Sequence, residues 1–174
     1  MNSRTSPDSE LDEYVRIEVI PDGQHLVESM FRHRYRQAAP DFPHHVVVFC
    51  RSVSGSGQWL PAAYMHATDR GDFLLGGGAC VDDRVIRQLS RESRNAIAKA
   101  GGLYLHALRW AMAYFSPHYA AIFGYCGDRL AERIDLSAGF VHTVHANLLV
   151  YFTRELTDAE KNRLIEDANK IGPF

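Results

Sequence analysis

The sequence has few of the features that mark membrane, secreted or metal-binding proteins. No apolar run reaches the 18 residues that a membrane-spanning helix needs. Only three cysteines are present, far apart and odd in number, so we expect no disulfide framework. Nine histidines occur without CxxC, HExxH or paired-histidine spacing, so no metal site is expected. These absences favour a cytoplasmic protein with reduced, buried thiols.

An excess of charge of one sign is also lacking. The 19 Lys and Arg residues nearly balance the 21 Asp and Glu residues, and the formal net charge is −2. No overall field therefore attracts nucleic acid or an anionic membrane, although a local basic patch stays open as an alternative. Hydrophobic residues make up 46% of the 174 residues, which is ordinary for a globular domain with one buried core.

The N-terminal stretch carries no structural pattern. Residues 1–13 are rich in Ser, Asp, Glu and Pro, and they lack the basic and apolar regions of a signal peptide. We therefore predict a disordered tail over residues 1–13 and a single domain over residues 14–174.

Hydrophobic periodicity after the tail predicts a strand, a helix and then three strands. The helix is expected to begin near Asp22 as N-cap. We place the strands at 14–20, 46–50, 60–67 and 72–81, and the helix stripe at 26–35. The strand at 46–50 is apolar throughout, which predicts burial on both faces. The strand at 72–81 contains three consecutive glycines, which indicate a β-bulge or the close approach of another backbone or a ligand.

The second half of the chain predicts further helices around a central strand. A polar helical stretch at 82–100 is expected to break at Ser90, and Gly101-Gly102 would end it. The remaining elements are expected as a helix at 103–115, a strand at 119–125, a helix at 128–137, a strand at 142–152 and a helix after the capping box at 157–160. The fold class that follows is α+β, a mostly antiparallel mixed sheet with helices on both faces.

One stretch carries a family motif. Asp128, Ala131, Asp135, Gly139 and Phe140 have the spacing N-x-x-A-x-x-x-Y-x-x-x-G-F, with identity at Ala131 and at Gly139-Phe140. In this motif and in the order of its elements, the chain resembles the GNAT superfamily of N-acyltransferases. The resemblance implies a GNAT-like fold and a divergent member of that family.

The resemblance also implies acetyl-CoA or another acyl-CoA as cofactor, with the acyl group between the fourth and fifth strands. The family holds the pyrophosphate at R/Q-x-x-G-x-G/A, for which Lys99, Gly101 and Gly102 are the counterparts here. Lys99 replaces Arg or Gln, and Tyr104 replaces a small residue, so this loop departs from the pattern. The two glycines would form an anion-binding nest or, alternatively, a plain helix–helix junction.

Three further residues belong to the implied cofactor site. Backbone N–H groups at Cys80 and Val81 would hold the thioester carbonyl, and Asp128 stands at the Asn position of the motif.

Asp135 stands where the family has a Tyr that often serves as general acid. A carboxylate at its ordinary pKa cannot donate a proton at pH 7, so Asp135 would need burial, or would act as a base or amine anchor. Alternatively it is exposed or paired with Arg129 or Arg133. Tyr125 is a second candidate for handling the proton. Cys126 would be a nucleophile if its pKa were lowered, and otherwise an inert core thiol.

Histidines supply further candidates. His66 and His106 lie on apolar elements and would be general bases or, more commonly, hydrogen-bonded core residues. His142 and His145 are expected on opposite faces of one strand, which is not a ligand pair.

A repeat of arginines offers a different function. Arg84, Arg87, Arg91 and Arg94 recur at three- and four-residue spacing and would form one cationic helix face. This face would contact the phosphates of a nucleic acid or would simply be solvated.

We interpret the chain as a divergent acyl-CoA-dependent N-acyltransferase that acts on a small-molecule amine. The alternatives are a nucleic-acid-directed, phage-type nucleobase-modifying enzyme on the same fold and a non-catalytic GNAT-like binding protein. A homodimer is left open, and no membrane partner is expected.

Overall fold

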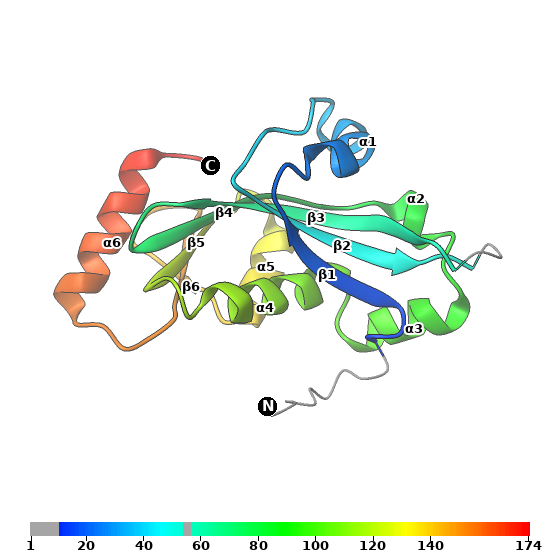
Figure 1. Cartoon of the computed structure of the whole chain (residues 1–174). Coiled ribbons are helices and arrows are strands. Elements are labelled where there is room, and N and C mark those ends of the chain that lie inside the picture. Colours follow the sequence, from blue (N-terminus) through cyan, green and yellow to red (C-terminus); the bar gives the residue numbers. More distant parts are fainter. Residues whose placement is uncertain (1–10, 54–56) are drawn as a thin grey trace.

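A seven-stranded mixed sheet runs through the molecule (Figure 1), and the computed structural model describes residues 11–53 and 57–174. The strands are β1 (Val15–Ile20), β2 (His44–Arg51), β3 (Trp59–Asp69), β4 (Phe73–Val81), β5 (Ala121–Tyr125), β6 (Val141–His142) and β7 (Leu148–Phe152). Their order across the sheet is β1-β2-β3-β4-β5-β7-β6. Every neighbouring pair is antiparallel except β4 and β5, which are parallel.

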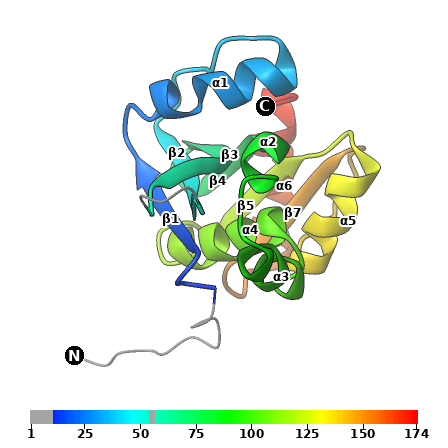
Figure 2. The same cartoon turned by 90° about the vertical axis from the view of Figure 1, so that its right-hand side faces the viewer.

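Helices cover both faces of the sheet. They are α1 (Gln24–Tyr35), α2 (Asp83–Ile86), α3 (Arg91–Lys99), α4 (Leu103–Phe115), α5 (Arg129–Ala138) and α6 (Asp158–Ile171). Helices α3, α4 and α5 lie on one face, and α1 and α6 on the other (Figures 1 and 2). The α+β prediction is confirmed.

The alternation of β2 explains why its sequence is apolar throughout. Val46 and Val48 pack with the α4 layer, whereas Val47 packs with the α1 layer, and all three are fully buried. A strand covered on both faces cannot alternate polar with apolar residues.

Strands β4 and β5 pair over only part of β4. Residues 73–76 pair with residues 121–124, and β4 then continues to Val81 with no β5 partner. The sheet therefore opens between the C-terminal ends of the two strands.

The three consecutive glycines of β4 lie where the sheet opens. The β-bulge and the close approach of another backbone, which these glycines predicted, are both found. The β3–β4 register shifts between Tyr64 and His66, and Gly78 has a φ of 56°, so a β-bulge is present. A Cβ at Gly77 would lie 2.8 Å from the backbone oxygen of Phe174, so another backbone also approaches closely.

Several predicted boundaries were wrong. Leu11 is buried in the core, so the packed domain begins before residue 14, while residues 1–10 of the predicted tail lie outside the described residues. Asp22 does not cap α1, whose N-cap is Gly23 without a side-chain bond. The strand expected at 142–152 is instead the pair β6 and β7, joined by a turn in which Asn147 has a φ of 65°.

Two predicted helix starts are confirmed. The Ser90 hydroxyl accepts a hydrogen bond from the Ser93 N–H and separates α3 from α2. Thr157 and Glu160 form the capping box of α6. In the described ranges, no helix is both long and apolar enough to cross a membrane.

Candidate functional site

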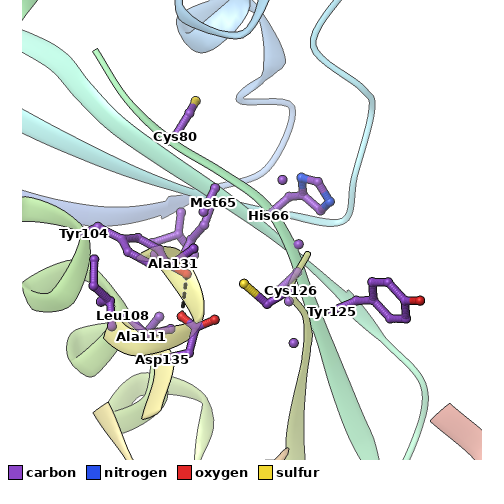
Figure 3. Close-up of a pocket in the computed structure, with 18 of the residues that line it drawn as sticks. Met65, His66, Cys80, Tyr104, Leu108, Ala111, Tyr125, Cys126, Ala131 and Asp135 are labelled. Atoms are coloured by element: carbon purple, nitrogen blue, oxygen red, sulfur yellow. Dashed lines mark hydrogen bonds between the residues drawn. The ribbon is translucent and has the colours of Figure 1, made fainter. Parts of the chain in front are cut away.

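A cleft of about 520 Å³ occupies the opening between β4 and β5 (Figure 3). Gly76 and Gly124 pair where the strands diverge, so no side chain fills the base of the opening. Side chains of α4 and α5 line one side, and the end of α1 reaches the rim through Arg34 and Tyr35. The cleft thus opens toward both faces of the sheet.

Helix α5 brings Asp135 into this cleft. Its N-cap is Asp128, whose Oδ1 accepts hydrogen bonds from the N–H groups of Leu130 (2.8 Å) and Ala131 (3.0 Å). Asp135 follows Ala131 by four residues and therefore shares its face, toward the cleft. It is only 6% exposed. The alternative of an exposed or arginine-paired Asp135 is not what the structure shows.

The hydroxyl of Tyr104 donates a hydrogen bond to Asp135 Oδ1 at 2.8 Å. Burial raises the pKa of Asp135, while the hydrogen bond from Tyr104 and the nearby Cys126 thiol oppose the rise. Burial and the neighbouring carboxylate raise the pKa of Tyr104 as well, so its phenol stays neutral. The pair therefore holds a carboxyl group whose pKa lies above its ordinary value.

The sequence drew attention to Tyr104 only as a departure from the pyrophosphate loop. The signal that could have identified it is an exchange: a Tyr appears on α4 where a small residue belongs, while an Asp stands at the Tyr position of α5.

Cys126 and Tyr125 lie near the cleft but in different surroundings. The Cys126 thiol donates to the Asp128 carbonyl at 3.2 Å, and burial raises its pKa, which favours the thiol over the nucleophilic thiolate. Tyr125 points away from Asp135, toward the other face of the sheet (Figure 3), where its ring meets that of Phe174. The structure does not bring Tyr125 to the Tyr104–Asp135 pair.

The two glycines before α4 use their N–H groups within the chain. Gly101 donates to the Ala98 carbonyl at 3.0 Å, and Gly102 donates to the Ile97 carbonyl at 2.9 Å. Both have positive φ and together end α3, as a helix–helix junction would. The first N–H of α4 that bonds to a carbonyl four residues back is that of His106. The N–H groups of residues 103–105 precede it, and Lys99 is exposed at the end of α3.

Cys80 and Val81 lie at the free end of β4. The Asp82 N–H donates to the Ala62 carbonyl at 2.8 Å. Because alternate residues of an antiparallel strand point to opposite neighbours, the N–H of Cys80 faces β3 and that of Val81 faces the open side. The Cys80 thiol is buried, which raises its pKa to about 12.

The four histidines that the sequence offered as candidates lie in different parts of the structure. His66 lines the cleft, whereas His106 is half-buried on α4 and is not part of the cleft wall. His145 Nε2 lies 2.8 Å from Glu166 Oε1, and His142 Nδ1 lies 3.8 Å from Glu132 Oε1. His142 and His145 do not share one strand, so that prediction was wrong.

The four arginines do not form one helix face, because Ser90 separates α2 from α3. The first two are paired with neighbouring carboxylates: Arg84 with Asp82 at 2.6 Å, and Arg87 with Asp83. Arg94 donates to the Leu89 carbonyl at 2.6 Å. The predicted continuous cationic face is therefore wrong. Among the described residues, no group of three or more His, Cys, Asp or Glu side chains is arranged to hold a metal ion.

Comparison with known proteins bears on the fold. No family model matches the chain, and no curated protein matches it. Among solved structures, the ribosomal-protein-S5-alanine acetyltransferase from Vibrio fischeri aligns with a TM-score of 0.50 and 9% identity, over 83% of this chain and 96% of that one. The cAMP-binding acyltransferase from Mycobacterium smegmatis aligns with a TM-score of 0.44 and 11% identity, over 90% of this chain and 50% of that one.

Identity at this level bears on architecture alone. The alignment with the first of these structures covers 83% of this chain and 96% of that one, so it extends over the whole mixed sheet and is not confined to one motif. The chain therefore has a GNAT-like fold.

Proposed function

We propose that the protein transfers an acyl group from an acyl-CoA to an amine. The observation that carries this proposal is the cleft between β4 and β5, with the buried Tyr104–Asp135 pair in its wall. A cleft between two diverging strands admits an extended, unbranched part of a donor molecule. Its apolar lining excludes water from a reacting thioester.

The donor would be held by backbone groups at both ends of the cleft. The Val81 N–H faces the open side of β4 and would donate to the thioester carbonyl oxygen, where negative charge develops. The pyrophosphate would bind at the N-terminus of α4, through the N–H groups of residues 103–105 and the positive end of the helix dipole. Gly101 and Gly102 would shape this turn, because their own N–H groups are already bonded.

Asp135 would supply the proton that the departing sulfur needs. An acyl-CoA brings an activated thioester whose C–S bond breaks as the amine nitrogen bonds to the carbonyl carbon. Burial raises the pKa of Asp135, which moves this carboxyl group toward the protonated form that a general acid needs, and the Tyr104 hydroxyl fixes one carboxyl oxygen. Cys126 would serve as packing and as a hydrogen-bond donor, because burial keeps its thiol protonated.

The nucleic-acid alternative is less well supported, because Arg84 and Arg87 are paired with carboxylates and lie on a different helix from Arg91 and Arg94.

Thermal unfolding with acetyl-CoA tests the proposal. A ligand at 100 times its Kd adds about 2.7 kcal/mol to the free energy of unfolding. For a chain of this size, each kcal/mol raises the Tm by about 2–4 °C. We therefore expect a rise of about 5–10 °C with saturating acetyl-CoA and a smaller one with ATP, which lacks the pantetheine arm. An unchanged Tm at millimolar acetyl-CoA would remove the basis of the proposal.

A further inference from the structure

The cleft continues beneath the sheet, past the point where β4 and β5 diverge. Gly76 and Gly124 form the last pair before the opening, yet Leu74 and Ile122, two residues earlier on each strand, also line the cleft. Both of these side chains belong to the cluster that packs against α4. The cleft therefore has a part between the sheet and α4, which we call the inner cleft.

Helix α4 forms one wall of the inner cleft along nearly its whole length. Its lining residues recur at the spacing of one helix face and are Tyr104, Leu108, Ala111, Met112 and Phe115. Figure 3 shows Leu108 and Ala111 on the same side of the sheet as Tyr104 and Asp135. At a rise of about 1.5 Å per residue, the first and last of these positions are about 16 Å apart. The inner cleft is therefore elongated along the helix.

The walls of the inner cleft are apolar. Met65 and Ala67 of β3 line it opposite α4, and both belong to the same apolar cluster. In the described ranges, the buried side-chain polar atoms that lack a partner belong to other places, namely Gln24, Ser93 and His66, which points to the opposite face of the sheet (Figure 3). Water would find no hydrogen-bond partners between these walls, so the space suits an apolar group.

The far end of the inner cleft is closed by aromatic rings. Phe115 is buried, and its ring packs on His44 and Tyr119 at centroid distances of 5.5 Å and 6.2 Å. Two of the lining side chains are the flexible thioethers of Met65 and Met112, which adapt to the shape of an occupant. The inner cleft thus opens toward the Tyr104–Asp135 pair and ends blindly at Phe115.

We propose that the inner cleft holds the hydrocarbon chain of the acyl group, and that the donor is a medium-chain acyl-CoA of about eight carbons. The inference rests on the proposed acyl transfer. A thioester held at the Val81 N–H has its acyl chain directed along the opening, and the inner cleft continues that opening. An acetyl group would leave the inner cleft empty, and side chains that line an empty space lose their contacts.

The length of the inner cleft agrees with such a chain. An extended polypeptide advances about 3.5 Å over its three backbone bonds, and a carbon chain advances similarly, so eight carbons span about 8 Å. That is about half of the distance along α4, and the thioester and the ring of Phe115 occupy the remainder. A branched or bulky acyl group would not fit lengthwise between a sheet and a helix that pack on each other.

The bonds made and broken stay those of the proposed transfer. The acceptor nitrogen forms a bond to the carbonyl carbon, and the carbon–sulfur bond breaks. The nitrogen passes one proton to solvent, and the sulfur takes one from Asp135, which regains a proton from water. The products are an amide with a medium-length chain and free CoA.

Calorimetric titration of an acyl-CoA series into the wild type tests the inference. The series is acetyl-, butanoyl-, hexanoyl- and octanoyl-CoA. Each fully buried CH₂ strengthens binding about fourfold. We therefore expect the affinity to rise at every step, and by at least about 10²-fold from acetyl- to octanoyl-CoA. Equal affinities across the series, or a fall with increasing length, would overturn the inference.

Ala111→Leu and Ala113→Leu form a matched pair on α4, because Ala111 lines the inner cleft whereas Ala113 is exposed. Ala111→Leu should lower the affinity for octanoyl-CoA at least about tenfold more than that for acetyl-CoA, since the added carbons take the space of the chain. Ala113→Leu should leave both affinities unchanged. Equal effects of Ala111→Leu on the two donors would contradict the inference.

The Tm of the same two variants tests the free space without any donor. A Leu that enters an empty apolar space leaves the Tm of Ala111→Leu no lower than that of Ala113→Leu. In a filled core the same Leu would be overpacked and would lower the Tm by about 5 °C or more. Such a drop would show that no chain can lie beside Ala111.

Two results separate this inference from the proposed function. If acetyl-CoA raises the Tm but octanoyl-CoA binds no more tightly, this inference fails and the proposed function stands. If free octanoate binds saturably to the wild type and more weakly to Ala111→Leu, while none of the acyl-CoA molecules binds, the inner cleft stands as a hydrocarbon site and the proposed function fails.

Discussion

Tyr104 and Asp135 are 31 residues apart in the sequence, and their hydrogen bond makes two departures from the family pattern into one feature. Taken singly, a Tyr in the pyrophosphate loop and an Asp at the Tyr position both suggest a lost function. Together they restore a hydroxyl next to the cleft and add a carboxyl group whose pKa burial raises. Neither spacing nor residue type predicts this contact, because it depends on how α4 and α5 pack.

Asp135→Asn should change how stability depends on pH. The pKa of Asp135 is raised by folding, so its stabilising contribution is complete below the unfolded value of about 3.9 and is lost as pH rises through the folded value. An Asn side chain does not ionise, so the stability of the variant has no such pH dependence at this position. Its amide oxygen can still accept the hydrogen bond from the Tyr104 hydroxyl. In urea unfolding, the variant should gain stability relative to the wild type as pH rises from 4 to 8. A difference that does not vary with pH would contradict a buried, raised Asp135.

Gly78→Ala should destabilise the fold by about 2 kcal/mol, the range for a strained backbone combined with overpacking. Gly78 has a φ of 56°, and a Cβ there would meet the ring of His66. The matched control is Gly127→Ala, since Gly127 has no heavy atom within 4 Å of its added Cβ. Thermal unfolding measures both. Adding His66→Ala to Gly78→Ala should recover part of the loss, and no recovery would exclude the steric cause.

Features that depend only on neighbouring residues in the sequence could be predicted. Features that depend on contacts between distant parts of the chain could not. Ser90 and the Thr157–Glu160 box could be placed because a cap needs only its own first turn. The surroundings of the His66 ring depend on Phe42 and Gly78, which reach it from other parts of the chain.

At the scale of elements, α5 depends on its cap. Asp128→Ala should cost about 1 kcal/mol, because two N–H groups lose their acceptor. Asp128→Asn keeps a side-chain oxygen and should cost only a few tenths of that. Urea unfolding of the two variants measures the difference. Equal losses would mean that the negative charge at the helix N-terminus, rather than the cap geometry, supports α5.

Element boundaries failed where a single residue reverses the chain. By composition the apolar residues 148–152 continue the pattern of residues 141–142, but Asn147 in the left-handed region turns the chain into a hairpin. Asp22 likewise adopts a left-handed conformation and leaves the cap position to Gly23. Asn and Asp favour turns and caps alike, so the sequence does not distinguish these roles.

At the scale of the whole molecule, the functional feature is an opening in a sheet. Phe73–Gly76 pair with Ala121–Gly124, which lie more than 40 residues further along, and the pairing then stops. No local pattern predicts where a parallel pair ends, so the cleft was expected from the family resemblance rather than from periodicity. In the sequence itself, only the three consecutive glycines indicated a β-bulge or a close approach at this point of β4.

Calorimetric titration of acetyl-CoA into the wild type and Ala131→Phe tests the central claim most directly. Ala131 lines the cleft on the half-buried face of α5, so a Phe there would fill the space that the thioester needs. Ala159→Phe places the same ring on the exposed face of α6 and serves as the matched control. We predict saturable binding to the wild type and to Ala159→Phe, and a loss of at least about tenfold in affinity for Ala131→Phe, a change of about 1.4 kcal/mol. Unaltered affinity in Ala131→Phe, with its fold intact by circular dichroism, or no binding to the wild type, would contradict a donor site between β4 and β5.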